Sequence, residues 1–171
     1  MKIWYRRLFL VASVGGGFSG IAITSTQLFR SGQPPIVYLI YIAVSAAYAA
    51  GIYGGIKLIE DEARGLSLLS WYFLVQIPAV SSPVITYLFW SGFSMYLSGG
   101  SNGFNWRALY GARWLVNLLR PEDVSVEVGI NLFALWATWF LRRELSRLRA
   151  RPLPDPPQAP GTSAVGEPPP P

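Results

Sequence analysis

Apolar residues along this chain fall into long runs without a charged side chain. Three runs stand out: Leu8–Phe29, Ile36–Ile56 and the much longer Gly65–Trp106. A bilayer core about 30 Å thick needs about 20 apolar residues of helix. The first two runs therefore each predict one membrane crossing, as helices from about Ile3 to Phe29 and from Ile36 to Ile59.

The first run is expected to stay as a helix rather than to be cleaved as a signal peptide. Lys2, Arg6 and Arg7 resemble the positive start of a signal peptide. The apolar run is, however, longer than the roughly 7–15 residues of a signal-peptide core, and no small-residue cleavage site follows it. Trp4 and Tyr5, beside the arginines, are typical of an anchor at the membrane surface.

The third run is too long for one ordinary crossing and has prolines in its middle. As a single helix, Leu66–Leu97 would contain Pro78 and Pro83, and proline removes a backbone donor and kinks a helix. Two interpretations follow. Either one long helix crosses the membrane with a proline kink, or two half-helices form a re-entrant hairpin that returns to its starting side.

The distribution of lysine and arginine distinguishes these two interpretations. With a kinked crossing, the N-terminus, the 57–64 loop and the C-terminal tail share one side, which holds 10 Lys and Arg against 4 on the other. With a re-entrant hairpin the numbers are 8 against 6. Because cytoplasmic loops carry an excess of Lys and Arg, the pattern favours the kinked crossing, with both termini in the cytoplasm.

The last third of the chain predicts two further helices and a tail. Trp106–Arg120, after a Gly/Ser/Asn-rich loop, has an apolar and a polar face at helical spacing and is predicted to lie flat in the headgroup region. A helix from Pro121 to about Ala150 is predicted to make a fourth crossing over Val124–Leu141, and Arg142-Arg143 anchors it. Almost half of the positions in 152–171 are proline, which predicts a disordered, proline-rich cytoplasmic tail.

These elements predict an all-α, multi-pass membrane protein with four transmembrane helices, the third kinked by proline, and one interfacial amphipathic helix. Residues 1–151 would form the helical membrane domain. The composition resembles that of a GC-rich bacterial genome, so we expect the bacterial inner membrane.

Composition excludes several kinds of chemistry. The chain has no cysteine and no histidine, which excludes disulfides, thiol nucleophiles, Cys/His zinc sites and histidine acid–base catalysis. The net charge of +5 comes mostly from the two ends, so we interpret it as membrane topology and expect no nucleic-acid partner. We expect no cofactor, no metal site and no catalytic residue. No charged side chain falls at mid-membrane depth in a predicted span, which argues against a proton-coupled transporter.

One group of polar residues is predicted to lie within the membrane. Gln76, Ser81 and Ser82 flank Pro78 and Pro83, and Asn131 falls in the predicted fourth helix. Polar side chains near a proline break satisfy freed carbonyls or line a wet cavity. The structural interpretation is a kink with a Gln76–Asn131 hydrogen bond between helices, and the functional one is a substrate or ion site at a broken helix.

Small residues recur along the first two helices and predict a helix-packing face. In such stripes another helix backbone approaches closely. The first two helices would pack on each other within one molecule, because a short connection makes them neighbours, or the face would form a dimer. The face consists of Gly16, Gly20, Ala43, Ala47, Gly51 and Gly55.

The sequence therefore predicts a non-enzymatic accessory or scaffold subunit that acts by helix packing. Its partners would be the lipid bilayer and either a second copy of itself or another membrane protein. The alternative is a small oligomeric channel or transporter with a polar broken-helix site near Gln76–Pro83. Replacing Gln76 by Leu distinguishes the two, since a scaffold would tolerate the change and a pore would lose transport.

Overall fold

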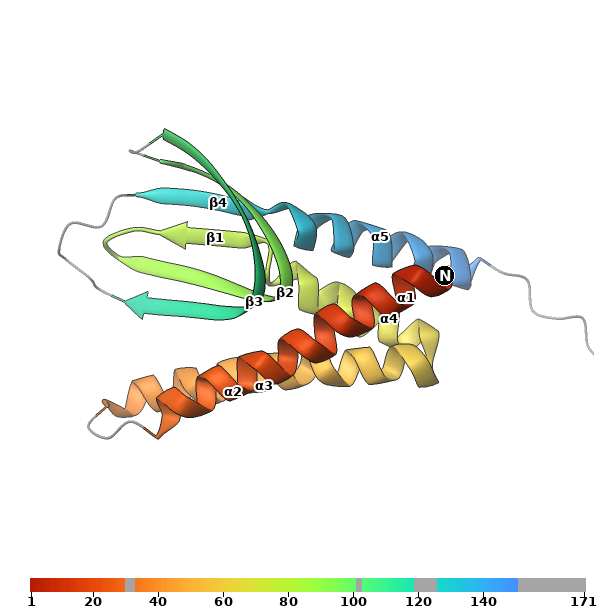
Figure 1. Cartoon of the computed structure of the whole chain (residues 1–171), viewed down its shortest axis with the longest axis horizontal. Helices are drawn as coiled ribbons and strands as arrows, with labels where there is room; N and C mark the ends of the chain where they lie inside the picture. Colours follow the sequence, from red (N-terminus) through yellow and green to blue (C-terminus); the bar gives the residue numbers. More distant parts are fainter. Residues whose placement is uncertain (30–32, 101–102, 119–125, 151–171) are drawn as a thin grey trace, which may run out of the picture.

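The structure is a computed structural model that describes residues 1–29, 33–100, 103–118 and 126–150. Two long helical rods lie side by side, and a shorter pair of helices and a curled sheet pack against them (Figure 1). The elements in chain order are α1 (Ile3–Leu10), the π-helical turn η1 (Val11–Gly15), α2 (Gly16–Leu28), α3 (Pro35–Glu60), α4 (Glu62–Leu74), β1 (Pro78–Ser81), β2 (Ile85–Gly100), β3 (Gly103–Leu118), β4 (Glu127–Asn131) and α5 (Leu132–Arg149).

The two N-terminal helices are confirmed almost to their predicted ends. The segments α1, η1 and α2 form one rod, Ile3–Leu28, and α3 forms the other. Each is 26 residues long, with mean hydropathy 1.6 and 1.8, and each is long and apolar enough to cross a membrane. Proline at the first position of α3 suits a helix start, because its missing N–H would have no partner there. In the part of the chain that the structure describes, only these two helices pass that test.

The predicted third crossing is wrong. Helix α4 ends at Leu74, and the chain then forms strand β1 and the long strand β2. Pro78 is the first residue of β1, a position where its missing N–H costs little. The residues that follow, Val80 and Val84 to Tyr87, are β-branched or aromatic and suit a pleated strand. The prolines therefore end the helix instead of kinking it, and neither the kinked span nor the re-entrant helical hairpin forms.

The predicted interfacial helix, Trp106–Arg120, is also wrong over its described residues. The segment belongs to β3, which pairs antiparallel with β2 from Gly100↔Gly103 at the tip to Ile85↔Leu118 at the base. Its polar residues are separated by even numbers of positions, a spacing that also places them on one face of a strand. Because both spacings fit the sequence, the long antiparallel pairing with β2 makes this segment a strand instead of a helix.

The predicted fourth helix is half correct. Residues Glu127–Asn131 form strand β4, and only Leu132–Arg149 are helical, as α5. Asn131 accepts a hydrogen bond from the Ala134 amide at 3.3 Å and so caps α5. The expected start at Pro121 and the proline-rich tail of residues 152–171 lie outside the described residues. The fold is therefore mixed α/β with a four-stranded antiparallel sheet, and the prediction of an all-α protein with four transmembrane helices is overturned.

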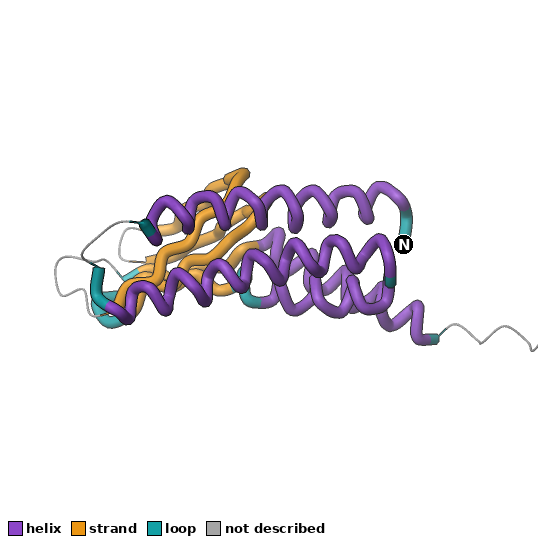
Figure 2. The backbone as a smooth tube through the Cα atoms, turned by 90° about the horizontal axis from the view of Figure 1, so that it is seen from below, coloured by secondary structure: helices purple, strands orange, loops and turns teal. Residues whose placement is uncertain are grey.

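The short helices α4 and α5 lie along one half of the molecule's long axis, and the sheet lies along the other half. Helices α4 and α5 pack beside the half of the rods that holds the N-terminus, and the sheet packs beside the other half (Figures 1 and 2). The core runs through the junction, where Phe9, Tyr48, Phe73 and Leu141 are fully buried. Aromatic rings bridge the elements there: Phe9 lies 5.8 Å from Phe73, and Tyr48 lies 4.8 Å from Phe89 of β2.

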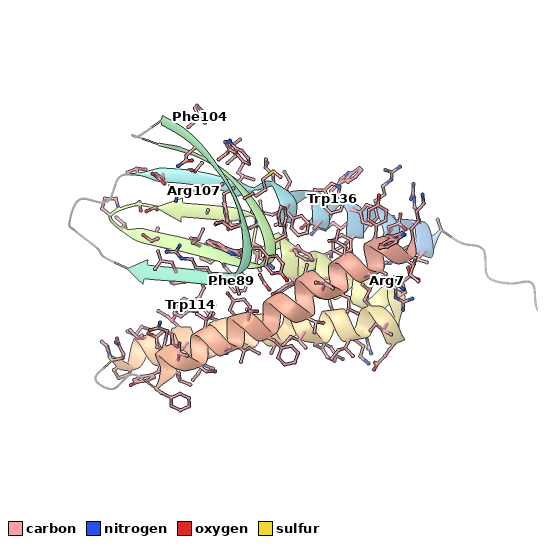
Figure 3. All side chains as sticks on the ribbon, viewed as in Figure 1. Arg7, Phe89, Phe104, Arg107, Trp114 and Trp136 are labelled. Carbon is pink, nitrogen blue, oxygen red and sulfur yellow. The ribbon has the colours of Figure 1, made fainter. Side chains whose placement is uncertain are left out.

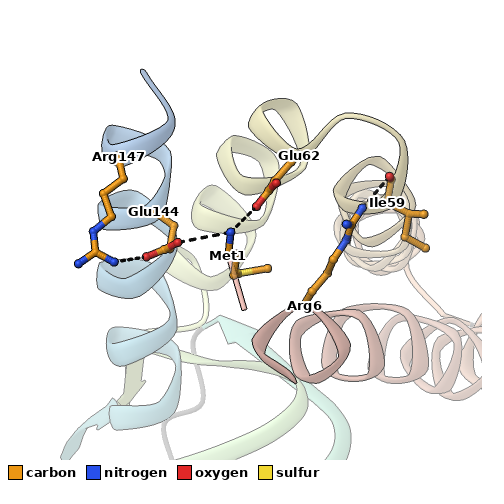
Figure 4. Close-up of polar contacts among 6 residues, drawn as sticks. All are labelled: Met1, Arg6, Ile59, Glu62, Glu144 and Arg147. Atoms are coloured by element: carbon orange, nitrogen blue, oxygen red, sulfur yellow. Dashed lines mark hydrogen bonds and ion pairs between the residues drawn. The ribbon is translucent and has the colours of Figure 1, made fainter. Parts of the chain in front are cut away.

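Ion pairs and a cap tie the helix ends together at the N-terminal end (Figure 4). The Met1 ammonium lies 2.9 Å from Glu62 of α4 and 3.7 Å from Glu144 of α5. Arg6 donates a hydrogen bond to the Ile59 carbonyl at 2.7 Å and so caps the C-terminus of α3. The start of α1, the turn between α3 and α4, and the end of α5 therefore meet at one end of the molecule.

Candidate functional site

The sheet curls into a small, nearly closed ring. Near its start β2 pairs with β1, at Val80↔Tyr87 and Ser81↔Thr86, and near its end it pairs with β4, from Tyr96↔Asn131 to Gly100↔Glu127. Strands β1 and β4 pair with each other and complete the ring. Strand β2 must therefore bend strongly between its two ends.

Two glycines allow the hairpin to bend. Gly92 of β2 lies opposite Gly111 of β3, and both have positive φ, +79° and +126°. L-residues with a side chain rarely adopt that backbone conformation, so glycine is required at such a pair. The bend lets β2 meet β1 on one side of it and β4 on the other.

The inner face of the curled sheet lines an open pocket of about 240 Å³. On β3 and β4 the lining residues occupy alternate positions, as expected for one face of a strand. The pairs Trp90↔Arg113, Tyr96↔Arg107 and Ser98↔Asn105 share this face across β2 and β3. Strands β1 and β4 add Ser81 opposite Glu127. The lining is therefore mixed, with aromatic side chains beside hydroxyl, amide and charged groups.

Two arginines dominate the charge of this pocket. The Arg113 guanidinium lies 5.9 Å from the centre of the Trp90 ring, a cation–π distance. Arg107 lines the same pocket from the other half of β3 (Figure 3). Among the described residues, neither arginine has a carboxylate within ion-pair distance, and Glu127 is the one acid in the lining. The described lining of the pocket therefore carries a net positive charge.

Buried aromatic rings form the apolar wall of the pocket. Trp90 and Tyr96 are almost fully buried, with ring centres 5.3 Å apart. The Tyr96 hydroxyl donates to the Phe89 carbonyl at 3.5 Å. Arginines beside aromatic surface suit an organic anion, because guanidinium groups bind carboxylate or phosphate through paired N–H donors.

The predicted polar residues Gln76 and Asn131 lie at the junction of helices and sheet. Both are fully buried. The Gln76 Oε1 atom accepts from the Ser91 amide at 2.9 Å, and the Asn131 Oδ1 atom accepts from the Met95 amide at 3.2 Å. These two amides lie on β2 between its pairing with β1 and its pairing with β4. Each side chain therefore replaces a missing strand and satisfies a buried backbone donor.

The four predicted residues do not form one site. The Ser82 hydroxyl accepts from the Ile85 amide at 3.1 Å and belongs to the turn between β1 and β2. Ser81 lines the pocket from β1. Gln76 and Asn131 each contact β2 instead of each other, so the structure gives no direct Gln76–Asn131 hydrogen bond.

The predicted helix-packing face is divided among several contacts within this chain. A Cβ on Gly20 would overlap the Tyr48 ring of α3, one on Gly51 would overlap the Tyr72 ring of α4, and one on Gly55 would lie 2.6 Å from the Ser13 Oγ atom. Gly16 instead meets the β2 backbone. Ala47 is half-buried and Ala43 is exposed.

Reasoning from the sequence did not identify the pocket residues Trp90, Tyr96, Arg107, Arg113 and Glu127. A usable signal was present in β3. The polar residues Asn105, Arg107 and Arg113 all occupy odd positions, as expected for one face of a strand.

Comparisons with known proteins give no relative: no family model matches the chain, and neither a curated protein nor a solved structure matches it. Function is therefore inferred from the pocket and the surfaces themselves.

Proposed function

We propose that this protein is a non-enzymatic protein of the bacterial inner membrane that binds a small organic anion in the pocket of its curled sheet. The observation that carries the proposal is the pair Arg107 and Arg113, which line one pocket without a carboxylate partner among the described residues. Both guanidinium groups are exposed at the pocket, and guanidinium groups bind carboxylate or phosphate through paired N–H donors. An anionic ligand would therefore form charge-assisted hydrogen bonds there.

The two apolar rods, Ile3–Leu28 and α3, support a membrane anchor. They have the length and hydropathy of spans, and basic residues gather at one end of the molecule. That end holds Lys2, Arg6 and Arg7 at the N-terminus and Arg142, Arg143, Arg147 and Arg149 on α5. By the positive-inside rule it would face the cytoplasm, with the tips of the sheet strands toward the opposite surface.

The composition of the pocket supports a ligand that combines an anionic group with a flat apolar part. Arg107 and Arg113 supply the charged donors, and Ser98 and Asn105 supply neutral ones. Trp90 and Tyr96 supply apolar surface. Phosphate esters and carboxylates of aromatic or heterocyclic compounds have both features, and the volume of about 240 Å³ suits a small molecule.

The test is equilibrium binding to the full-length protein in lipid nanodiscs. Isothermal calorimetry would compare inorganic phosphate, pyrophosphate and adenosine monophosphate with neutral adenosine. We expect an anion to bind and adenosine to bind far more weakly. Arg107→Gln and Arg113→Gln should each weaken binding by about tenfold or more, as expected for loss of a charge-assisted hydrogen bond.

Arg142→Gln is the matched control for these variants. Arg142 also lies over a tryptophan, 5.5 Å from the Trp71 ring, but it belongs to α5 and lies outside the pocket. Its variant should bind as the unchanged protein does. If none of the anions binds, or if all three variants lose binding equally, the pocket proposal is wrong.

An accessory role through helix packing is the second candidate. Ala43 of the predicted helix-packing face is exposed on α3, as are the nearby Ala46 and Ala50, so small residues there are open to a partner helix. The mass of the complex after gentle extraction from native membranes tests this role. A defined partner in stoichiometric amount supports it, whereas a monomer favours the binding role alone.

A pore at Gln76–Pro83 is less well supported. Both polar atoms of the Gln76 amide form hydrogen bonds. Its Nε2 atom donates to the Tyr72 carbonyl at 3.3 Å, and its Oε1 atom accepts from the Ser91 amide of β2. These contacts leave it as a buried structural group.

A further inference from the structure

The outer face of the curled sheet is almost wholly apolar. On β3 the residues that alternate with the pocket lining are Phe104, Trp106, Ala108, Tyr110, Ala112, Trp114 and Val116. On β4 the outward residues are Val128 and Ile130, which alternate with Glu127 and Gly129 of the lining. No charged residue of the described strands lies on this face, because Arg107, Arg113 and Glu127 all belong to the pocket face.

This pattern is the reverse of a sheet in water. A sheet of a water-soluble protein buries its apolar face and exposes its polar one. Strands that alternate apolar outside and polar inside are instead typical of sheets surrounded by lipid. The sheet therefore has the residue pattern of one that faces an apolar medium on its outside.

Part of this outer face is covered by the protein and part is bare. Below the bend at Gly92 and Gly111, Trp114 packs against Tyr41 of α3 with ring centres 5.2 Å apart. Above the bend, the hairpin leaves the rods, and Phe104, Trp106 and Tyr110 are 89%, 69% and 74% exposed. Figure 3 shows Phe104 pointing away from the molecule at the tip of the hairpin.

We infer that the bare outer face of the β2–β3 hairpin rests in the interfacial region of the lipid bilayer, beside the membrane ends of α2 and α3. The face carries tryptophan, tyrosine and phenylalanine, and aromatic side chains of this kind concentrate at membrane–water interfaces. Below the bend the same face meets the rods through Trp114 and Tyr41, and the rods carry exposed apolar residues of their own, including Ile23, Phe29 and Leu39. The inference rests on the proposed membrane location of the two rods, and it is independent of what the pocket binds.

The unpaired edge of β3 indicates how deeply the hairpin lies in the bilayer. Strand β3 ends the strand order of the sheet, so one of its edges has no partner among the described strands. Unpaired backbone groups are not tolerated in the hydrocarbon core, but water and headgroups satisfy them at the interface. The hairpin tip also lies at the end of the molecule opposite the N-terminus (Figure 1), where the rods would reach the membrane surface.

The absence of native cysteine makes a direct test practical. Single-cysteine variants of the full-length protein in phosphatidylcholine nanodiscs would carry a nitroxide spin label. Power saturation would compare access of oxygen, which partitions into lipid, with access of a water-soluble nickel chelate. The outward positions are Trp106→Cys, Ala108→Cys and Tyr110→Cys, and their inward neighbours on the same strand are Asn105→Cys and Arg107→Cys.

We expect accessibility to alternate from each position to the next along the strand. Outward positions should have an oxygen-to-nickel ratio several-fold above that of their inward neighbours. Ile42→Cys, on an exposed position of α3, provides the lipid reference. Ala108→Cys is the mildest change, so it keeps the test valid if a tryptophan or tyrosine variant does not fold.

Two results would overturn the inference. If outward and inward positions are equally open to the nickel chelate, the face lies in water. If the outward positions are shielded from both reagents, a protein surface covers them. If the Arg107 variant lost anion binding while accessibility still alternated along the strand, only the pocket proposal would be affected.

Discussion

Gly16 of α2 lies directly against the backbone of Gly92, so that a Cβ atom on Gly16 would overlap the Gly92 nitrogen. A Cβ on Gly92 would in turn lie 2.5 Å from the Ala12 carbonyl oxygen. The first rod thus touches the sheet at the point where the hairpin bends. The π-helical turn Val11–Gly15 ends at this contact. In this turn the Ser13 hydroxyl donates to the Phe9 carbonyl of α1 at 2.7 Å. The glycine contact therefore fixes the sheet to the first rod.

Replacing Gly16 by alanine should destabilise the protein by about 1–3 kcal/mol, as expected for overpacking against rigid backbone. Its neighbour is the control. A Cβ on Gly15 would meet nothing within 4 Å, so Gly15→Ala should be neutral or stabilise by up to about 1 kcal/mol through better helix propensity. Thermal unfolding in detergent, followed by tryptophan fluorescence, measures both. Equal effects of the two substitutions would contradict the close contact.

The sequence predicted the two rods because the hydropathy of each is high along its whole length, and no tertiary contact is needed to explain it. The prediction failed at Gly65–Trp106 for a physical reason. Strand β2 is buried on both faces over much of its length, with Phe89 facing the helices and Trp90 facing the pocket. A strand of this kind has an unbroken apolar run and resembles a membrane helix in composition.

The sequence did not predict the pocket, for a different physical reason. Its residues come from four strands, and only the ring of β1, β2 and β4 brings Ser81 and Glu127 to the face that holds Arg107. Pairing of that kind depends on long-range register, which local patterns do not specify. In contrast, Gln76 and Asn131 were recognisable in advance, because uncharged amides in apolar runs must find partners wherever they are buried.

Replacing Asn131 by leucine should cost more stability than replacing Gln76 by leucine. Both changes leave a buried β2 amide without an acceptor, at about 1–3 kcal/mol. Asn131 has a second role, since the same oxygen accepts from Ala134 and caps α5. Loss of that cap adds about 1 kcal/mol.

Denaturant or thermal unfolding of the two leucine variants would be compared with Asn105→Leu, at an exposed pocket position. The Asn105 variant should unfold like the unchanged protein. If Gln76→Leu left stability unchanged but altered ion or solute flux in proteoliposomes, the amide would have a transport role instead of a structural one.

Arg6 should contribute to stability through the cap that it places on α3. Its guanidinium donates to the Ile59 carbonyl at 2.7 Å, near the negative end of that helix. Arg6→Gln should therefore destabilise by about 0.3–1 kcal/mol, and high salt should reduce the difference between variant and unchanged protein. Arg7 is the neighbouring control, because its guanidinium lies 5.6 Å from the Trp4 ring of its own helix. A larger effect of Arg7→Gln than of Arg6→Gln would contradict this assignment.

Removing the acid from the pocket should strengthen anion binding. Glu127 lines the pocket with Arg107 and Arg113 and opposes an incoming negative charge. Glu127→Gln keeps the size of the side chain and should tighten binding of the anion identified by calorimetry by about two- to fivefold, the size of one partly exposed charge interaction. The gain in affinity should shrink as salt is raised, because ions screen exposed charges.

Glu60→Gln is the control, since Glu60 pairs with Lys57 at 2.7 Å outside the pocket. Equal tightening by both substitutions would point to the net charge of the protein, and weaker binding by Glu127→Gln would show that the carboxylate itself holds the ligand.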